Sequence, residues 1–156
     1  MKSILIAVFI LLIIIIIGFY RYESFLNGYW IGENNFLQKA QLDDFQLFIA
    51  PNGDGYLLIT DQNGEFISNQ AIKIKKSFDV WTLLSPLSFL FSIESDKYTR
   101  KIAIECDQNT AIPKKLKMTV SLINNTLTLY DDKKIYAHMV KDNTISNAAI
   151  KMWKKN

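Results

Sequence analysis

Several side chains in the sequence have the types that bind metal ions or catalyse reactions. The segment from Asp61 to Glu65 has the carboxylate and amide oxygens that bind calcium. A calcium loop of the EF-hand type needs glycine at its sixth position and glutamate at its twelfth. This segment has glycine at the fourth position and Ile72 at the twelfth. We interpret it as a hairpin turn, because Asp, Asn and Gly favour turn conformations.

The other reactive side chains also have simpler structural explanations. The pairs Asp43–Asp44 and Asp131–Asp132 are adjacent in sequence, so in a strand their carboxylates point to opposite faces rather than across a cleft. Cys106 follows two alternating isoleucines, which predicts a small core residue rather than an activated thiolate. His138 has no serine or cysteine motif as a partner. We therefore expect no catalytic residue, metal site or cofactor, and a protein that is not an enzyme.

An uninterrupted apolar run lies near the N-terminus. From Ile4 to Ile17 every residue is apolar, and residues 18–20 extend the run to Arg21. At about 1.5 Å rise per residue, such a helix is about 25 Å long, close to the hydrocarbon thickness of a thin bilayer. The run predicts a single-pass membrane protein whose first partner is the lipid bilayer. The residues that we expect to anchor it are Ile4, Phe9, Ile13, Ile17 and Tyr20.

A cleaved signal peptide is the main alternative explanation of this run, and a buried core helix is a second one. The apolar region of a signal peptide is usually about 7–15 residues long and is followed by small residues at the cleavage site. Here the run is longer, and the residues that close it, Gly-Phe-Tyr-Arg-Tyr, offer no such site. We therefore favour a retained anchor.

Beyond Arg21 apolar residues alternate with polar ones, as in strands that are buried on one face. Residues 116–122 alternate strictly, and Asn124–Asn125 then predicts a tight turn, because Asn tolerates positive φ. The inward faces predicted for the next two strands are Leu127 and Leu129, then Ile135, Ala137 and Met139. This part of the chain therefore predicts a three-strand meander.

The same alternation appears upstream, with turn-forming clusters at residues 51–55 and 61–64. About eight or nine short strands joined by short turns predict an antiparallel meander, either a closed barrel or a sandwich. The upstream inward faces are Phe45, Leu47 and Ile49, then Ile72 and Ile74, then Phe89, Phe91 and Ile93, then Ile102, Ile104 and Cys106. The apolar side of a predicted C-terminal helix is Ile145, Ala149, Met152 and Trp153.

These patterns divide the 156-residue chain into three parts. Residues 1–21 are the predicted transmembrane anchor, residues 22–142 the antiparallel β domain, and residues 143–156 a short helix or tail. The part after the anchor is long enough for one domain with its own hydrophobic core. The predicted fold class is therefore mainly β, with an N-terminal transmembrane helix and a short C-terminal helix.

Charge is unevenly distributed along the chain. Residues 111–156 hold nine lysines and three aspartates, whereas acidic side chains outnumber basic ones in residues 21–110. In one compact domain these halves lie side by side and largely neutralise each other. The terminal lysines Lys151, Lys154 and Lys155 are the candidates for contact with anionic lipid head groups or an acidic protein. We expect no nucleic-acid partner, because no arginine cluster or recognised module accompanies them.

The residues Gly28-Tyr29-Trp30 resemble the G-x-W motif that opens the first strand of lipocalin-like barrels. In such barrels the tryptophan packs across the closed end, commonly beside a basic residue from a late strand. The resemblance implies that Gly28 and Trp30 pack at a barrel end, and that the barrel holds an apolar ligand. The only arginines are Arg21 and Arg100, and the second lipocalin motif is absent. A membrane-tethered lipocalin-like binder is thus the alternative function.

A second pattern is spread over most of the soluble part: Gly28-Tyr29-Trp30, Phe36, Ala40, Leu42, Phe45, Leu47 and residues 55–59, 135–137 and 141–143. It resembles small membrane-anchored virion proteins of nucleocytoplasmic large DNA viruses, which are minor capsid or inner-membrane proteins. The resemblance implies a structural role at the inner virion membrane, with capsid or membrane proteins as partners and no catalytic residues. Our leading hypothesis is a structural virion protein in the viral inner membrane that contacts capsid components through its β domain.

Overall fold

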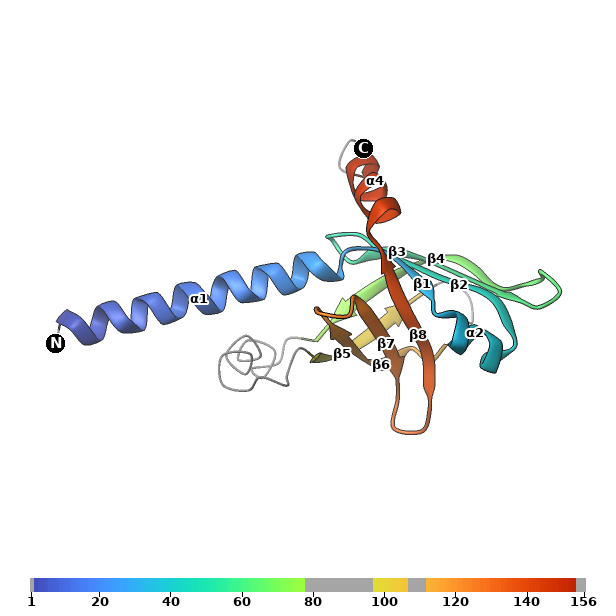
Figure 1. The fold of residues 1–156 in the computed structure, drawn as a ribbon, viewed down its shortest axis with the longest axis horizontal. Coiled ribbons are helices and arrows are strands. Elements are labelled where there is room, and N and C mark those ends of the chain that lie inside the picture. The colour runs from blue at the N-terminus through green and yellow to red at the C-terminus, as the bar shows by residue number, and fades with distance from the viewer. Residues whose placement is uncertain (1, 78–96, 107–111, 154–156) are drawn as a thin grey trace.

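The computed structural model describes residues 2–77, 97–106 and 112–153. Figure 1 shows a long N-terminal helix, α1, that projects from one end of a β-barrel, and a short helix, α4, at the same end. The predicted fold class is confirmed: the protein is mainly β, with an apolar N-terminal helix and a short C-terminal helix. Of the two predicted sheet architectures, the structure has the closed barrel.

Helix α1 begins at Lys2 and ends at Leu26. Its segment Ile4–Leu26 is long and apolar enough to span a membrane. A helix that exposes apolar side chains all round is suited to lipid, because its backbone hydrogen bonds are all internal. It continues beyond residue 21, where the predicted anchor ends, and its final residues pack against the barrel core. The predicted anchor side chains, all exposed, are Ile4, Phe9, Ile13, Ile17 and Tyr20.

The strands follow one another around the barrel, and each pairs antiparallel with the next strand in sequence. Strands β1 and β8 also pair with each other, so the sheet has no free edge. This is the topology of an up-and-down barrel. In chain order the strands are β1 Gly28–Gly32, β2 Leu42–Ile49, β3 Asp54–Asp61, β4 Phe66–Lys76, β5 Lys97–Glu105, β6 Lys115–Ser121, β7 Thr126–Tyr130 and β8 Ile135–Asp142.

Alternate side chains of the strands fill the interior of the barrel with one continuous apolar core. Successive side chains of a strand point to opposite faces, so the alternation in sequence becomes an inside and an outside. The buried residues of the predicted inward faces are Phe45, Leu47, Ile49, Ile72, Ile74, Ile102, Ile104, Leu116, Met118, Val120, Leu127, Leu129, Ala137 and Met139. The strand faces predicted from alternation are thus largely correct.

Two details differ from the sequence pattern, and one predicted strand is not tested. Ile135 is exposed although the pattern places it inside, because the register between β7 and β8 shifts at Leu129/Tyr130 and turns its side chain outward. Cys106 directly follows β5 and is only partly buried against the core. The strand predicted around Phe89, Phe91 and Ile93 lies outside the described residues.

A short helix, α2, spans Asn34–Ala40 between β1 and β2, where the sequence pattern predicts no helix. Seven residues are too few for a helical repeat of apolar residues to stand out. Its Leu37 is buried against Gly32, where a Cβ atom would lie 2.7 Å from Leu37 Cδ2. Because β1 leads from α1 directly to α2, the two helices cover opposite ends of the barrel.

The predicted turns are confirmed. In the segment from Asp61 to Glu65, the Asp61 carboxylate accepts hydrogen bonds from the backbone N–H groups of Asn63 and Glu65, each 2.9 Å long. Gly64 has φ of 78°, which a hairpin of this kind requires. Asn125 has φ of 54° in the turn between β6 and β7. The acidic segment is therefore a hairpin between β3 and β4.

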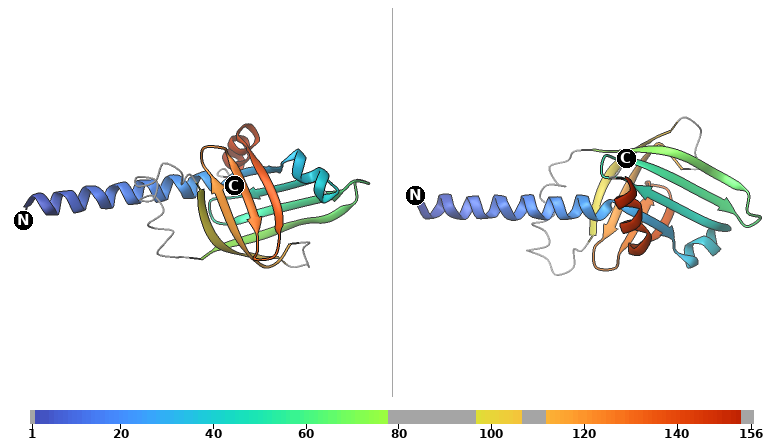
Figure 2. Two further views of the ribbon diagram at one scale, coloured as in Figure 1. Left: turned by 60° about the horizontal axis from the view of Figure 1, so that its bottom comes forward. Right: turned by 90° about the horizontal axis from the view of Figure 1, so that it is seen from above.

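Helix α4 spans Asn143–Trp153 and confirms the predicted C-terminal helix. The Asp142 carboxylate accepts a 2.9 Å hydrogen bond from the backbone N–H of Ile145, as at a helix N-cap. Figures 1 and 2 show α4 beside the last turn of α1 and running across its direction. The chain therefore returns at its end to the part of the barrel where α1 enters.

Candidate functional site

The last turn of α1 is built into one end of the barrel. Leu26 is fully buried, and so is Trp30 on β1. Trp30 Nε1 donates a 3.0 Å hydrogen bond to the Leu26 carbonyl. The rings of Phe25 and Trp30 meet edge to face, with centroids 5.8 Å apart and an interplanar angle of 71°. Helix and barrel thus share one packed unit, which we call the junction.

Lys141 from the last strand completes the junction. Its Nζ donates a hydrogen bond to the Phe25 carbonyl and lies 4.3 Å from the centroid of the Phe25 ring. The same ammonium lies 5.3 Å from the centroid of the Trp30 ring. A cation is favourable at this place because the C-terminal carbonyls of a helix carry partial negative charge and aromatic faces attract cations. Burial lowers the pKa of Lys141 from 10.5 to about 8.

A carboxylate on α1 is held by two cations of the barrel wall. Glu23 Oε2 lies 2.6 Å from Lys76 Nζ on β4, and Glu23 Oε1 pairs with Arg100 Nη1 on β5. Arg100 Nε also donates to the Ser77 carbonyl over 3.2 Å. The Arg100 side chain is only 5% exposed, so the Glu23 carboxylate compensates a positive charge that is almost completely removed from water. Burial also lowers the pKa of Lys76.

The start of α4 is hydrogen-bonded to the first residues of β1. The Ser146 hydroxyl accepts a 2.6 Å hydrogen bond from Tyr29 N and donates to the Tyr29 carbonyl over 3.2 Å. Gly28 has φ of 127°, and a Cβ there would lie 2.6 Å from Ser146 Oγ. Only glycine fits this conformation and this space. The residue that the G-x-W motif places first is therefore needed for the contact with α4.

The structure brings only some of the residues singled out in the sequence to this place. Gly28 and Trp30 both lie at the junction, in the barrel-end position that the resemblance implied. The backbone of Lys151 belongs to α4, but its side chain is outside the described part. Lys154 and Lys155 lie outside the described residues altogether.

Sequence reasoning did not find the charged residues of the junction. Glu23, Lys76 and Arg100 come from α1, β4 and β5, and no local spacing connects them. Lys141 had one signal: the resemblance implied a basic residue from a late strand beside the tryptophan. A search among arginines alone overlooks it, because the residue at that place is a lysine.

His138 has partners that its sequence context did not suggest. On the outer wall, His138 Nδ1 lies 2.8 Å from Thr128 Oγ1 and His138 Nε2 lies 3.0 Å from Glu33 Oε2. The backbone N–H of Glu33 also bonds the His138 carbonyl over 2.9 Å. The Glu33 and His138 side chains are more than a third exposed, so this wall offers no shielded site for an activated hydroxyl. The contacts tie the start of α2 to β8.

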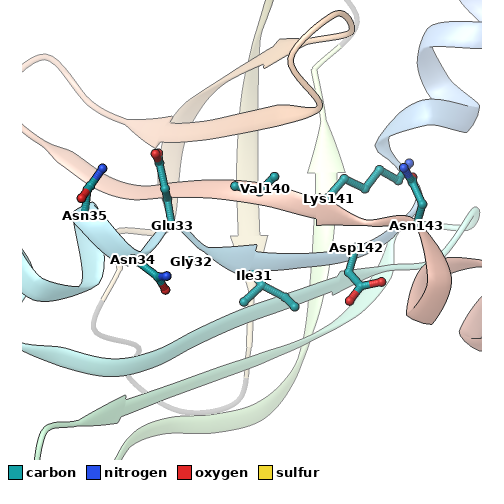
Figure 3. A pocket seen from close by; sticks show the side chains of 9 residues that line it. All are labelled: Ile31, Gly32, Glu33, Asn34, Asn35, Val140, Lys141, Asp142 and Asn143. Carbon is teal, nitrogen blue, oxygen red and sulfur yellow. The ribbon is translucent and has the colours of Figure 1, made fainter.

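An open groove of about 670 Å³ lies on the outer wall between β1 and β8 (Figure 3). Its lining includes Ile31, Val140 and several amide side chains. The two carboxylates there already have partners, because Asp142 caps α4 and Glu33 contacts His138. Within the described part of the chain, no group of three or more His, Cys, Asp and Glu residues is placed to hold a metal ion. The groove is therefore a surface trough without convergent reactive groups.

The barrel interior is filled by its own side chains. Leu57, Leu127 and Met139 are 0% exposed, so no space large enough for water touches them. Leu26 and Trp30 fill the α1 end, and Leu37 lies at the other end. Among the described residues, the inward side chains leave no room for the apolar ligand that the lipocalin resemblance implied.

The sequence is similar to proteins of African swine fever virus. Uncharacterized protein EP152R of the Pretoriuskop isolate is 27% identical over 147 residues, which cover 92% of this chain and 91% of that protein. The homologues of this chain are therefore viral proteins. The same protein of a Malawi isolate is 25% identical over 145 residues, covering 90% of this chain and 89% of its own length. No protein-family model and no solved structure matches the chain.

The Glu23 contacts predict a stability effect. Glu23→Gln removes the carboxylate shared by a buried guanidinium and a largely buried ammonium, so the free energy of unfolding should fall by about 1–3 kcal/mol. Chemical denaturation of the full chain in detergent, followed by circular dichroism of the strands, measures it. Glu65→Gln in the exposed hairpin is the matched control and should change little. Equal stabilities of the two variants would contradict the assigned role of Glu23.

The lowered pKa of Lys141 predicts a pH dependence. The folded chain releases this proton near pH 8, whereas the unfolded chain keeps it up to about 10.5. Below pH 8 the folded chain bears the full cost of burying the charged ammonium. Between pH 8 and about 10.5 this cost decreases, so the free energy of unfolding should increase with pH over this range. Lys141→Met should lack this increase, as measured by denaturation at pH 7 to 10. If the free energy of unfolding changes with pH in the same way for Lys141→Met and for the unaltered chain, this assignment to Lys141 is refuted.

Proposed function

We propose that this chain is a structural virion protein, held in the viral inner membrane by α1 and in contact with capsid components through its barrel. The chain contributes no chemistry of its own in this role. Its task is to hold a folded surface at a fixed place on a membrane.

The junction is the observation that carries this proposal. Only Asn27 lies between the last residue of α1 and the first residue of β1, and Leu26 is already part of the core. No flexible linker separates the apolar helix from the barrel. A barrel joined in this way follows the helix as a rigid body, so the bilayer would set its distance from the membrane and its tilt.

The viral homologues support the same role. They match about nine-tenths of both chains, so the similarity includes most of the barrel and at least part of the apolar helix. African swine fever virus is a nucleocytoplasmic large DNA virus, the group to which the spaced residue pattern pointed. The names of these homologues state no function, so the virion role rests on the anchor and the junction.

The barrel end opposite α1 has the surface that a protein partner would use. The hairpin between β3 and β4 projects there, away from α1 (Figure 1). Phe66 and Ile67 beside its turn are 64% and 45% exposed. Two neighbouring apolar side chains at a projecting tip are suited to the centre of a small protein contact. Capsid components are the partners proposed for this tip.

The alternative, a lipocalin-like binder of an apolar ligand, has one observation in its favour and one against. Lys141 beside Trp30 reproduces the basic residue and tryptophan of that motif. The filled interior removes the cavity that ligand binding needs. We therefore propose that Trp30 and Lys141 close the barrel end and have no part in ligand binding.

The location of the protein tests the proposal. Mass spectrometry of purified particles of the virus that encodes the chain should find it, and alkaline carbonate should leave it in the membrane fraction. Absence from particles would reject the virion role. Release by carbonate would reject the anchor, because a peripheral protein is extracted under these conditions and a spanning helix is not.

The partner surface can be tested by photo-cross-linking inside particles. A photoreactive residue in place of Phe66 should form adducts with capsid proteins. Ile123, which is 70% exposed in the turn between β6 and β7, provides a matched control. That turn lies at the α1 end, because Asn125 O accepts a 2.9 Å hydrogen bond from Lys141 N. Capsid adducts at Ile123 but none at Phe66 would show that the assignment of the two ends is wrong.

A further inference from the structure

A second groove, of about 410 Å³, lies on the outer wall across β4, β5 and β6. We call it the lysine groove. Five lysines line it, namely Lys75, Lys76, Lys101, Lys115 and Lys117. Its other lining residues are Ser77, Ile102, Ala103, Leu116, Asp131 and Asp132. None of the roles described above uses this wall as a binding surface.

Strand register places a small residue between the lysines. Ala103 on β5 pairs with Lys75 on β4 at one side and with Lys115 on β6 at the other. Neighbouring strands are about 4.8 Å apart, so the two lysine backbones are about 10 Å apart with only a methyl group between them. Lys101 and Lys117 form the adjacent row. The four flexible side chains therefore surround a shallow apolar floor.

The lysines of the groove are only partly neutralised. Lys101 lies directly opposite Lys117, and like charges in this position repel each other. Lys75 contacts Glu105 over 2.7 Å, and Lys117 contacts Asp132 over 2.5 Å. Within the described part of the chain, Lys101 and Lys115 form no ion pair.

Asp131 lines the groove but forms no ion pair with either of these two lysines. Its carboxylate instead accepts hydrogen bonds from the backbone N–H groups of Lys133 and Lys134 and from the Tyr136 hydroxyl, so a single negative charge remains beside two lysines without an ion pair. The excess positive charge in the groove fits an anion.

The groove begins at the level where α1 meets the barrel. Lys76 and Arg100 both contact Glu23 of α1, and Lys75 and Lys101 are their neighbours along β4 and β5. Glu23 follows Tyr20, the end of the apolar run, by three residues, or about 4.5 Å along the helix axis. If α1 spans the bilayer, this end of the groove lies at the depth of the lipid head groups, which extend several ångströms beyond the hydrocarbon on each side.

We propose that the lysine groove binds the phosphate groups of anionic phospholipids in the membrane that holds α1. The inference rests on the proposed function, which puts α1 in a bilayer. The lysines around Ala103 supply the positive charge, and the phosphate relieves the repulsion between Lys101 and Lys117. The contact fixes the rotation of the barrel about the axis of α1, which a single helix leaves free.

Lysine acetylation in lipid nanodiscs tests the site. The full chain is reconstituted in nanodiscs of phosphatidylcholine alone or with phosphatidylserine, and a water-soluble reagent acetylates its lysines. Mass spectrometry then gives a rate for each residue. Lys101 and Lys115 should react about fivefold more slowly with phosphatidylserine, equivalent to about 1 kcal/mol for each lysine near an anionic surface. Lys39 on α2, at the other end of the barrel, should keep its rate.

A matched pair of variants separates the groove from a general effect of membrane charge. Ala103→Glu places a carboxylate on the floor of the groove. At Lys101 and at Lys115, the ratio of the acetylation rate without phosphatidylserine to the rate with it should then be close to one. Ala71→Glu introduces the same side chain at an exposed outward position of β4 outside the groove, and should leave that ratio unchanged. Equal protection in both variants would overturn the proposed site.

Two additions to phosphatidylcholine nanodiscs distinguish the source of the anion. Inorganic phosphate should not protect the lysines, and protection as strong as that by phosphatidylserine would contradict a lipid ligand. Polyglutamate that protects them better than phosphatidylserine would assign the groove to an acidic protein instead. Co-elution of the chain with the nanodisc is measured first, because it shows whether the chain has been incorporated. A chain that does not incorporate refutes the anchor and the lipid site together, whereas incorporation without protection refutes the lipid site alone.

Discussion

The structure depends on how the carbonyl groups at the end of α1 are satisfied. The last carbonyls of a helix have no partner within the helix, and burying them without donors is costly. Trp30 Nε1 and Lys141 Nζ donate to the carbonyls of Leu26 and Phe25, and both donors belong to the barrel. Phe25 and Leu26 in turn cover these two side chains. The helix end and the barrel end therefore satisfy each other's polar groups and bury each other's apolar side chains.

The strands could be predicted from the sequence because alternation is a local property. Leu127 and Leu129 show it within a few residues, and β7 follows it. The junction could not be predicted in this way. Lys141 reaches the Phe25 carbonyl across 116 positions of the chain, and only closure of β8 against β1 brings them together. The tertiary closure, rather than any spacing in sequence, decides which lysine becomes part of the site.

Among the described lysines, those at the junction differ in their electrostatics from those that form ion pairs on the outer wall. Lys76 and Lys141 are partly buried at the junction, and burial lowers the pKa of both. Lys73, Lys75 and Lys117 lie on the wall and contact Asp54, Glu105 and Asp132. Exposed pairs of this kind contribute little to stability. The acidic and basic halves of the sequence thus meet on the barrel, as their charges suggested, but without full neutralisation.

A barrel whose interior is full must act through its outside. Trp30 and Leu26 fill the interior at one end, and Leu37 is buried at the other. A ligand binder needs an open end and an empty centre, and the described residues provide neither. The closed interior serves rigidity instead, because a packed core resists deformation and transmits the orientation of α1 to the whole surface. Rigid presentation of a surface at a membrane is a structural task, and the arrangement of core, junction and outer wall is consistent with it.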